Sequence, residues 1–304
     1  MELRQLRYFL AVVDHLHFAR AAESLHISQP SLSQQIRALE EELGVVLFER
    51  SRRHVALTAD GEALLPYARR LVALAQDAEE EFAARSGLSR GRVRLGTTPT
   101  LGGHLLPRVI SGFFRKYPGL ELTITEDGSD HLARELERGQ IDLALLVEHP
   151  NMHGALFEPL LEEEIVAVLP QAHPLSERGT IPLRELREER FILCREGYHL
   201  RTLTLAVCRE AGFTPRIAVS GTDVDTALRF VRSGLGVTLV PQIALDDSRS
   251  VAALSLREPA VRRTVGLAWN PHRYLSKAAT AMRDYLRTAL RDGLPAGSGM
   301  DAPQ

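Results

Sequence analysis

Residues 18–50 read FARAAESLHISQPSLSQQIRALEEELGVVLFER and predict two short amphipathic helices joined by a tight turn. In the first helix, the pair Ala21-Ala22 is small enough for a second helix to cross closely, and His26-Ile27 occupies the turn. Ser28 is a good N-cap for the second helix, and Pro30 falls in its first turn, where the missing N–H costs nothing. This layout is typical of a helix-turn-helix, whose second helix enters the major groove of DNA.

The second helix separates its apolar side chains from its polar ones. A buried stripe is predicted from the helical spacing of Leu32, Ile36, Leu39 and Leu43. The opposite face offers the short donors and acceptors that read base edges or hold phosphates. The residues expected to contact DNA from this helix are Ser28, Gln29, Pro30, Ser31, Ser33, Gln34 and Arg37. An ordinary solvated helical hairpin is the alternative, but the caps, the alanine pair and the polar face all favour DNA binding.

A basic hairpin is predicted directly after the helix pair. Residues 46–50 and 55–57 read as two short strands around the tip Ser51-Arg52-Arg53-His54, which is the form of a wing. Arg50, Arg52 and Arg53 are therefore expected to contact DNA together with the second helix. A solvated basic loop is the alternative interpretation, because arginines are common on protein surfaces.

This N-terminal stretch resembles the DNA-binding domain of the LysR-type transcriptional regulators. The matching residues are Ala21-Ala22, Leu25, Ser28-Gln29-Pro30, Leu32-Ser33, Ile36, Leu39-Glu40, Leu43-Gly44, Leu47-Phe48, Arg50, Leu57-Thr58 and Gly61. The likeness continues in looser form through nearly the whole chain; a small departure is His17, where the family often has a hydroxyl residue. The resemblance implies a transcriptional regulator that binds operator or promoter DNA and assembles as a dimer of dimers, with RNA polymerase as a further partner.

Length and composition agree with a regulator of two or three domains. The chain has 304 residues, of which 44% are hydrophobic, and no apolar run reaches the eighteen residues of a membrane helix. Residues 3–13 predict a first helix and not a signal peptide, so we expect a cytoplasmic, nucleoid-associated protein without a membrane partner. Two cysteines argue against a disulfide scaffold. The net charge of −2 does not itself indicate nucleic-acid binding.

A long linker helix is expected next, capped by Thr58 and running to about Gly87. A helix of this length with one apolar seam needs a partner, which is expected to be the same helix of a second subunit. The dimerisation residues are predicted to be Leu64, Leu71, Leu74 and Phe82. The expected N-terminal organisation is an all-α winged helix-turn-helix at 1–58, the linker helix at 59–87 and a hinge at 88–91, within the polar stretch SGLSRG at 86–91.

Beyond the hinge, strand-like and helical runs alternate, which is typical of βαβ units and parallel sheets. Strands are predicted at 93–96, 120–125, 143–147, 165–169, 217–219 and 237–240, and helices at 104–116, 129–138, 200–211, 223–233 and 276–291. The alternation supports an α/β class, and the resemblance implies a two-lobed, periplasmic-binding-protein-like effector domain. Its expected bounds are 92–293, with lobe I at about 92–161 and 266–293, lobe II at about 162–265, and a disordered tail at 294–304.

A small-molecule effector is expected between the two lobes. Ligands in open α/β sheets bind beyond the carboxyl ends of strands, and helix N-termini there suit an anionic group. The residues predicted to bind the effector are Thr97, Thr98, Thr100, Ser129, Arg195, Thr202, Ser220 and Thr222. For the threonines and serines, simple helix capping is an equally good interpretation, and a surface salt bridge is the alternative for the arginine.

Cys208 gives an alternative function, a redox-sensing regulator that uses one cysteine. The peroxide-sensing branch of the family has a reactive cysteine nine positions before a second one, and here Cys208 matches the second while His199 takes the first position. Such a switch requires an exposed thiol with a lowered pKa, whereas a buried structural thiol is the alternative. An α/β enzyme is a remote alternative. We expect no enzymatic activity, no cofactor and no metal site.

Overall fold

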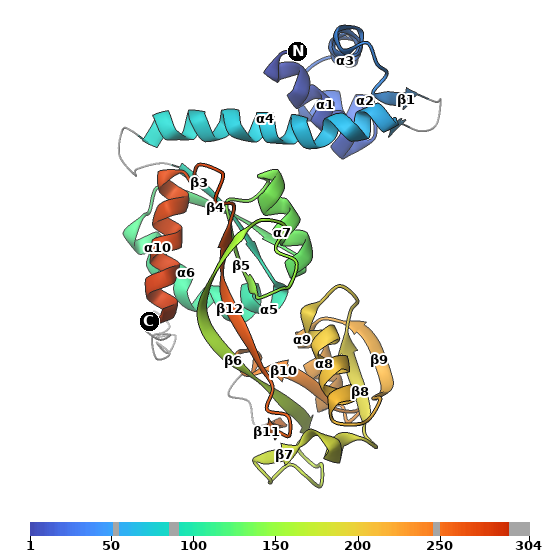
Figure 1. The fold of residues 1–304 in the computed structure, drawn as a ribbon, viewed down its shortest axis with the longest axis vertical. Helices are drawn as coiled ribbons and strands as arrows, with labels where there is room; N and C mark the ends of the chain where they lie inside the picture. Colours follow the sequence, from blue (N-terminus) through green and yellow to red (C-terminus); the bar gives the residue numbers. More distant parts are fainter. Residues whose placement is uncertain (51–54, 85–90, 246–249, 292–304) are drawn as a thin grey trace, which may run out of the picture. The chain divides into compact units, whose positions relative to one another are not determined.

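The computed structural model describes residues 1–50, 55–84, 91–245 and 250–291 (Figure 1). The wing tip with Arg52 and Arg53, most of the hinge and the C-terminal tail lie outside these residues, as do the side chains of Arg50 and Phe82. The chain divides into an N-terminal unit and a C-terminal unit, and each is described by itself. No helix in the described ranges is both long enough and apolar enough to cross a membrane.

The N-terminal unit contains three helices, a two-stranded hairpin and a long helix. Its elements are α1 (Leu3–His15), α2 (Phe18–Ser24), α3 (Gln29–Leu43), β1 (Phe48–Arg50), β2 (Val55–Leu57) and α4 (Ala59–Ala84). The three rings of Phe9, Phe18 and Phe48 form the centre of its core, with the centroid of Phe48 5.3 Å from Phe9 and 5.8 Å from Phe18. The expected helix pair and antiparallel hairpin are therefore present.

Local capping places α3 and α4 as the sequence predicts. Ser28 accepts a hydrogen bond from the backbone N–H of Ser31 at 3.4 Å and begins α3. His26 in the turn has a φ of 55°, in the left-handed region. The Thr58 hydroxyl accepts from the Gly61 N–H at 3.0 Å and donates to the Val46 carbonyl at 2.6 Å, so it joins α4 to the hairpin.

Packing in this unit differs from the prediction at one residue. Leu32, Ile36 and Leu39 are fully buried as predicted, but Leu43 is 38% exposed because α3 ends there and Gly44 turns the chain away. Position 61 has no space for a larger residue than glycine, because a Cβ atom there would lie 2.3 Å from the Leu47 carbonyl oxygen.

The C-terminal unit has two lobes that share one sheet. The strand order is β4-β3-β5-β12-β6-β11-β7, with β10 also paired to β6. The strands are β3 (Gly91–Thr97), β4 (Leu120–Glu126), β5 (Leu143–Val147), β6 (Leu156–Pro170), β7 (Thr180–Pro182), β8 (Arg190–Cys194), β9 (Arg216–Thr222), β10 (Thr238–Pro241), β11 (Val251–Arg257) and β12 (Arg262–Trp269). The α-helices are α5 (Pro99–His104), α6 (Leu106–Lys116), α7 (Ser129–Arg138), α8 (His199–Glu210), α9 (Val224–Arg232) and α10 (Lys277–Arg291). Two short 3₁₀ helices, η1 (Leu183–Leu186) and η2 (Gln242–Ala244), complete the unit.

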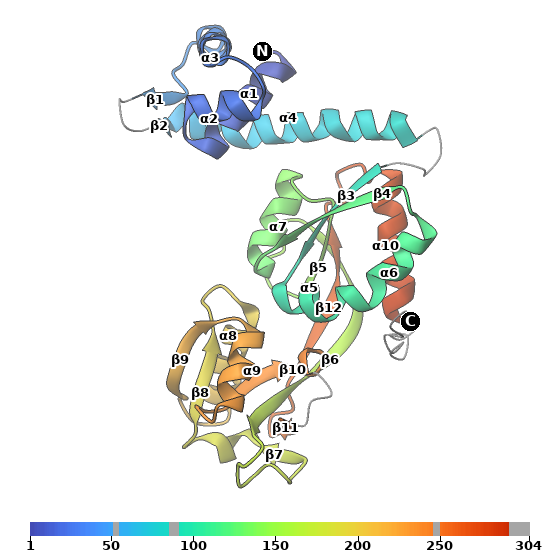
Figure 2. The same cartoon turned by 180° about the vertical axis from the view of Figure 1, so that it is seen from behind.

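Each lobe has its own hydrophobic core. In lobe I, α6 and α10 pack on one face of the sheet and α7 packs on the other (Figure 2). In lobe II, α8 and α9 pack against β8, β10 and the second half of β6. Strand β6 belongs to both lobes, because its first half pairs with β12 and its second half pairs with β10 and β11.

The prediction of parallel sheets is correct only in part. β3 pairs in parallel with β4 and β5, and β8 with β9, whereas β12, β10 and β11 run antiparallel to β6. The predicted strand at 165–169 is the second half of β6, and four strands, β7, β8, β11 and β12, were not predicted. The predicted helix at 104–116 corresponds to α6, and the short helix α5 before it was not predicted.

Candidate DNA-binding surface and interlobe pocket

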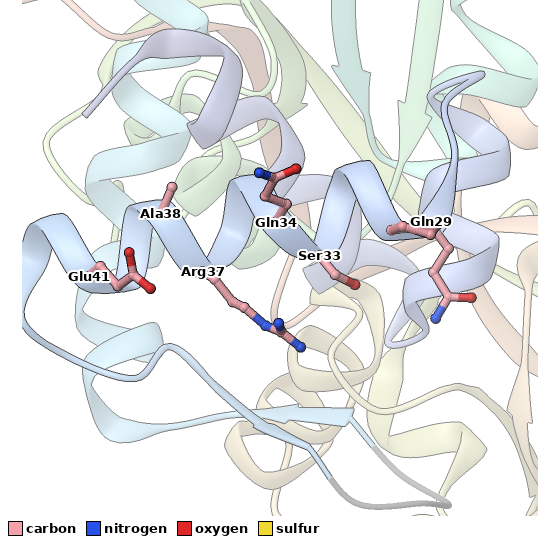
Figure 3. A pocket seen from close by; sticks show the side chains of 7 residues that line it. Gln29, Ser33, Gln34, Arg37, Ala38 and Glu41 are labelled. Atoms are coloured by element: carbon pink, nitrogen blue, oxygen red, sulfur yellow. The ribbon is translucent and has the colours of Figure 1, made fainter.

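One face of α3 carries the predicted DNA contacts. Its burial stripe of Leu32, Ile36 and Leu39 faces the core, which leaves the polar side chains on the outer side. Figure 3 shows Gln29, Ser33 and Arg37 projecting from the same side of the helix, one turn apart. A shallow hollow along this surface is lined by Gln29, Pro30, Ser33, Gln34, Arg37, Ala38 and Glu41. Ser28 and Ser31 lie at the start of the helix, where their hydrogen bond forms the cap.

The long helix α4 exposes a row of large apolar side chains. Tyr67 is 64% exposed, Leu71 41% and Leu74 60%, and they are separated by four and three residues on one helix face. Leu64, also predicted in this seam, is half-buried and packs partly against the core of its own unit. An apolar row of this kind on a long helix is suited to a partner helix.

A pocket between the two lobes of the C-terminal unit gathers three of the predicted effector residues. Thr98, Thr100 and Ser129 line it from lobe I, at the ends of strands and the starts of helices. The remaining lining residues are Pro99, Gly128, Val147, Tyr198, His199, Leu200 and Arg263. Thr97 lies fully buried beside the pocket, with its hydroxyl donating to the Thr98 carbonyl at 3.3 Å.

The other predicted effector residues do not line this pocket. Arg195 stacks over the ring of Tyr198, with its guanidinium carbon 4.7 Å from the centroid. Ser220 accepts a hydrogen bond from Arg201 at 2.7 Å, and Thr222 donates to the Leu193 carbonyl at 3.4 Å. Thr202 is exposed on α8.

Arg263 and His199 are pocket residues that sequence reasoning did not select. Arg263 lies on β12, directly across from Glu163 on β6. Its Nε donates to Glu163 Oε2 at 2.7 Å, and its Nη2 lies 2.6 Å from the same oxygen without hydrogen-bond alignment. Both side chains are buried, and burial lowers the pKa of Arg263 although Glu163 opposes this. The arginine pair at 262–263 inside an apolar strand was the available signal.

His199 begins α8 and is held in its neutral form. Burial is the main cause that lowers the pKa of His199 to about 4, and the positive charge of Arg263 contributes to the same shift. Its Nδ1 is buried and has no hydrogen-bond partner. The imidazole is therefore an uncharged polar group of the pocket at neutral pH.

Both cysteines are buried thiols. Cys208 is fully buried on α8, and burial raises its pKa to about 12. Burial, with Asp223 nearby, raises the pKa of Cys194 to about 11. A reactive cysteine needs the opposite environment, exposed and electropositive. The condition that the sequence set for a Cys208 switch is therefore not met in this structure. Within the described residues, no group of three or more His, Cys, Asp or Glu side chains is arranged to hold a metal ion.

Two family models together match most of the chain. Residues 3–62 match the bacterial regulatory helix-turn-helix protein of the lysR family, and residues 86–291 match the LysR substrate binding domain. The chain belongs to the LysR family of transcriptional regulators. The resemblance seen in the α3 region is thereby confirmed, and so is the combination of a helix-turn-helix with a two-lobed α/β effector-binding region.

Relatives of this chain match it over most of its length. The transcriptional dual regulator GltC of Bacillus subtilis is 36% identical over 289 residues, which cover 94% of this chain and 96% of GltC. A hydrogen peroxide-inducible genes activator of Escherichia coli O157:H7 is 33% identical over 274 residues, covering 89% and 90%. Among solved structures, a full-length OxyR variant from Pseudomonas aeruginosa gives a TM-score of 0.75 at 30% identity and covers 96% of this chain and 98% of its own.

Proposed function

We propose that this LysR-type regulator reads operator DNA through α3 and its wing, and is switched by a small molecule in the interlobe pocket. The observation that supports the switch is the set of buried polar atoms without a hydrogen bond on Thr98, Ser129 and His199, which line this pocket together with the Nη2 of Arg263 that is not aligned to any acceptor. Self-association through the apolar row of α4 would present two α3 helices to a two-fold operator. The proposal gives the pocket a ligand-holding role and no catalytic one.

The remaining expectations belong to the same proposal. The domain bounds are those set out from the sequence, and assembly as a dimer of dimers and contact with RNA polymerase are expectations from the family. So is a cytoplasmic, nucleoid-associated location. The predicted DNA contacts of the wing, Arg50, Arg52 and Arg53, also stay predictions. Native mass spectrometry on the full chain with operator DNA measures the number of subunits bound.

Base reading by α3 is tested with Gln29→Ala. A side chain that contacts a base edge carries about 1–3 kcal/mol of discrimination between sequences, so this variant should bind operator and scrambled DNA more nearly alike. Gln35 is a matched control, since it is a glutamine of the same helix that does not line the hollow. Competition gel shifts give both affinities, and full specificity in Gln29→Ala would show that another surface reads the bases.

The thiol alternative predicts a different set of responses. Removal of one hydrogen bond of about 1 kcal/mol from the pocket should weaken the effector response several-fold without unfolding the domain. We therefore expect Thr98→Val to reduce induction in a promoter-reporter assay and Cys208→Ser to leave it intact. Loss of a peroxide response in Cys208→Ser, with normal induction in Thr98→Val, would instead establish Cys208 as the sensor.

A further inference from the structure

We propose that the interlobe pocket is selective for a compact ligand with a single carboxylate, bound by Arg263, Thr98 and Ser129, with His199 as a fourth polar contact. This inference rests on the proposed function of the pocket as the effector site and names the chemical class of its ligand. Four properties of the pocket carry it: its unpartnered atoms, its charge, its apolar wall and its size.

The unpartnered atoms show where a ligand is required. Among the described residues, the buried pocket atoms Thr98 Oγ1, Ser129 Oγ and His199 Nδ1 have no hydrogen-bond partner. Arg263 Nη2 lies 2.6 Å from Glu163 Oε2 in an ion pair, but it is not aligned to donate a hydrogen bond to it. A buried polar atom is unfavourable while it stays unsatisfied, and native proteins contain few of them. Arg263 can only donate, so whatever binds there must bring an acceptor.

The positive potential in the pocket is sufficient to compensate one negative charge on a ligand. Arg263 is already balanced by Glu163, and His199 is neutral at physiological pH. The additional positive potential comes from two helix N-termini, because Ser129 is the first residue of α7 and His199 is the first residue of α8. Each N-terminus is equivalent to roughly half a positive charge, so together they compensate about one anion.

A second negative charge would have no partner in this pocket. Arg263 is the one lysine or arginine among the lining residues, and it is already paired with Glu163. Burial of an unpaired carboxylate is strongly unfavourable. We therefore expect discrimination against dicarboxylates, as well as against uncharged amides of the same shape, which do not use the helix N-termini.

The apolar part of the pocket wall and the size of the cavity limit the non-polar part of the ligand. Pro99, Val147 and Leu200 are apolar lining residues, so they suit a short aliphatic tail. The cavity between the lobes is small, at about 20 Å³, which is room for about one water molecule. The lobes meet at Gly128, where a Cβ atom would lie 2.7 Å from the Gly197 carbonyl oxygen. They also meet where His104 Nε2 lies 3.1 Å from Asp225 Oδ1. The cavity must therefore widen to admit a ligand, and a compact ligand requires the least widening.

The test is calorimetric titration of the full-length protein with acetate, propionate and butyrate, compared with acetamide and succinate. We expect the monocarboxylates to bind at least ten-fold more tightly than either comparison compound. Ser129→Ala and Thr98→Val should each weaken binding about five-fold. Arg263→Lys keeps the charge opposite Glu163 but loses the guanidinium fork, and should weaken binding at least ten-fold. Thr202→Val is the matched control outside the pocket and should change nothing; a thermal melt verifies that each variant is folded.

Several results would overturn the ligand class and leave the effector pocket itself standing. Equal binding of acetate and acetamide would show that charge is not recognised, and equal binding of succinate would show that the pocket accepts two charges. No binding of any probe, with Thr98→Val still reducing reporter induction, would assign the pocket to another class of effector. The proposed function fails separately, if the pocket variants change neither ligand binding nor induction, in which case ordered water alone satisfies these atoms.

Discussion

Leu71→Glu is expected to convert the assembled protein into folded monomers. Leu71 lies between Tyr67 and Leu74 in the exposed apolar row of α4, and it is 41% exposed, so a charge there does not enter the core of its own unit. In an interface between two such helices, the carboxylate would instead be buried without a partner, at a cost of several kcal/mol. Sedimentation velocity at micromolar concentration should show the loss of the larger species, and circular dichroism should show unchanged helix content.

Gln76→Glu is the matched control for this experiment. Gln76 is an exposed residue of the same helix, and its position two residues from Leu74 places it away from the apolar row. It adds the same charge and should leave the assembly unchanged. If Leu71→Glu sediments as the unaltered protein does, α4 is not the dimerisation helix. A monomeric Leu71→Glu should also lose affinity for a two-fold operator, because each half-site of the operator would then bind a separate subunit independently.

Glu163→Leu is expected to lower the free energy of unfolding of the C-terminal unit by about 3–5 kcal/mol, because it leaves Arg263 buried without its partner. The variant also removes the acceptor for the Ile243 N–H, which Glu163 Oε1 binds at 3.1 Å. Trp269 is the single tryptophan of the chain and ends β12, so its fluorescence during urea denaturation reports on the strand that carries Arg263.

The double variant Glu163→Leu with Arg263→Leu separates the missing partner from general damage. Replacing both members of a buried ion pair by apolar residues is often close to neutral, so the double variant should regain most of the lost stability. The difference between the single and double variants gives the coupling of the pair. Equal destabilisation in both would mean that the strand tolerates no change here, and that the ion pair is not the cause.

The helix-turn-helix could be predicted in detail because its signals are local. The Ser28 cap, the Thr58 cap and the helical spacing of Leu32, Ile36 and Leu39 each act within a few residues, and each is present in the structure. The DNA contacts assigned to α3 and the wing stay predictions, since the structure contains no DNA.

The strands that connect the lobes could not be predicted in the same way. The first half of β6 carries acidic side chains at Glu158, Glu162 and Glu163, which hide its strand pattern in the sequence. In the fold these charges have partners far along the chain: Glu158 binds Arg287 on α10, and Glu163 binds Arg263 on β12. Polar residues inside a strand become favourable only when such partners are in place.

The amino-acid sequence alone indicated the family and the α/β class of the effector unit, and it predicted loops as candidates for holding a ligand. The tertiary structure decided which of those loops meet, and it added Arg263 of strand β12 to them. Thr98, Ser129, His199 and Arg263 come from four separate segments, and they line one pocket because β6 and β12 join the two lobes. The tertiary structure also decided the state of Cys208, since only packing around α8 buries its thiol and raises its pKa to about 12. Caps and helical periodicity act within a few residues, whereas burial and pairing depend on contacts between distant parts of the chain.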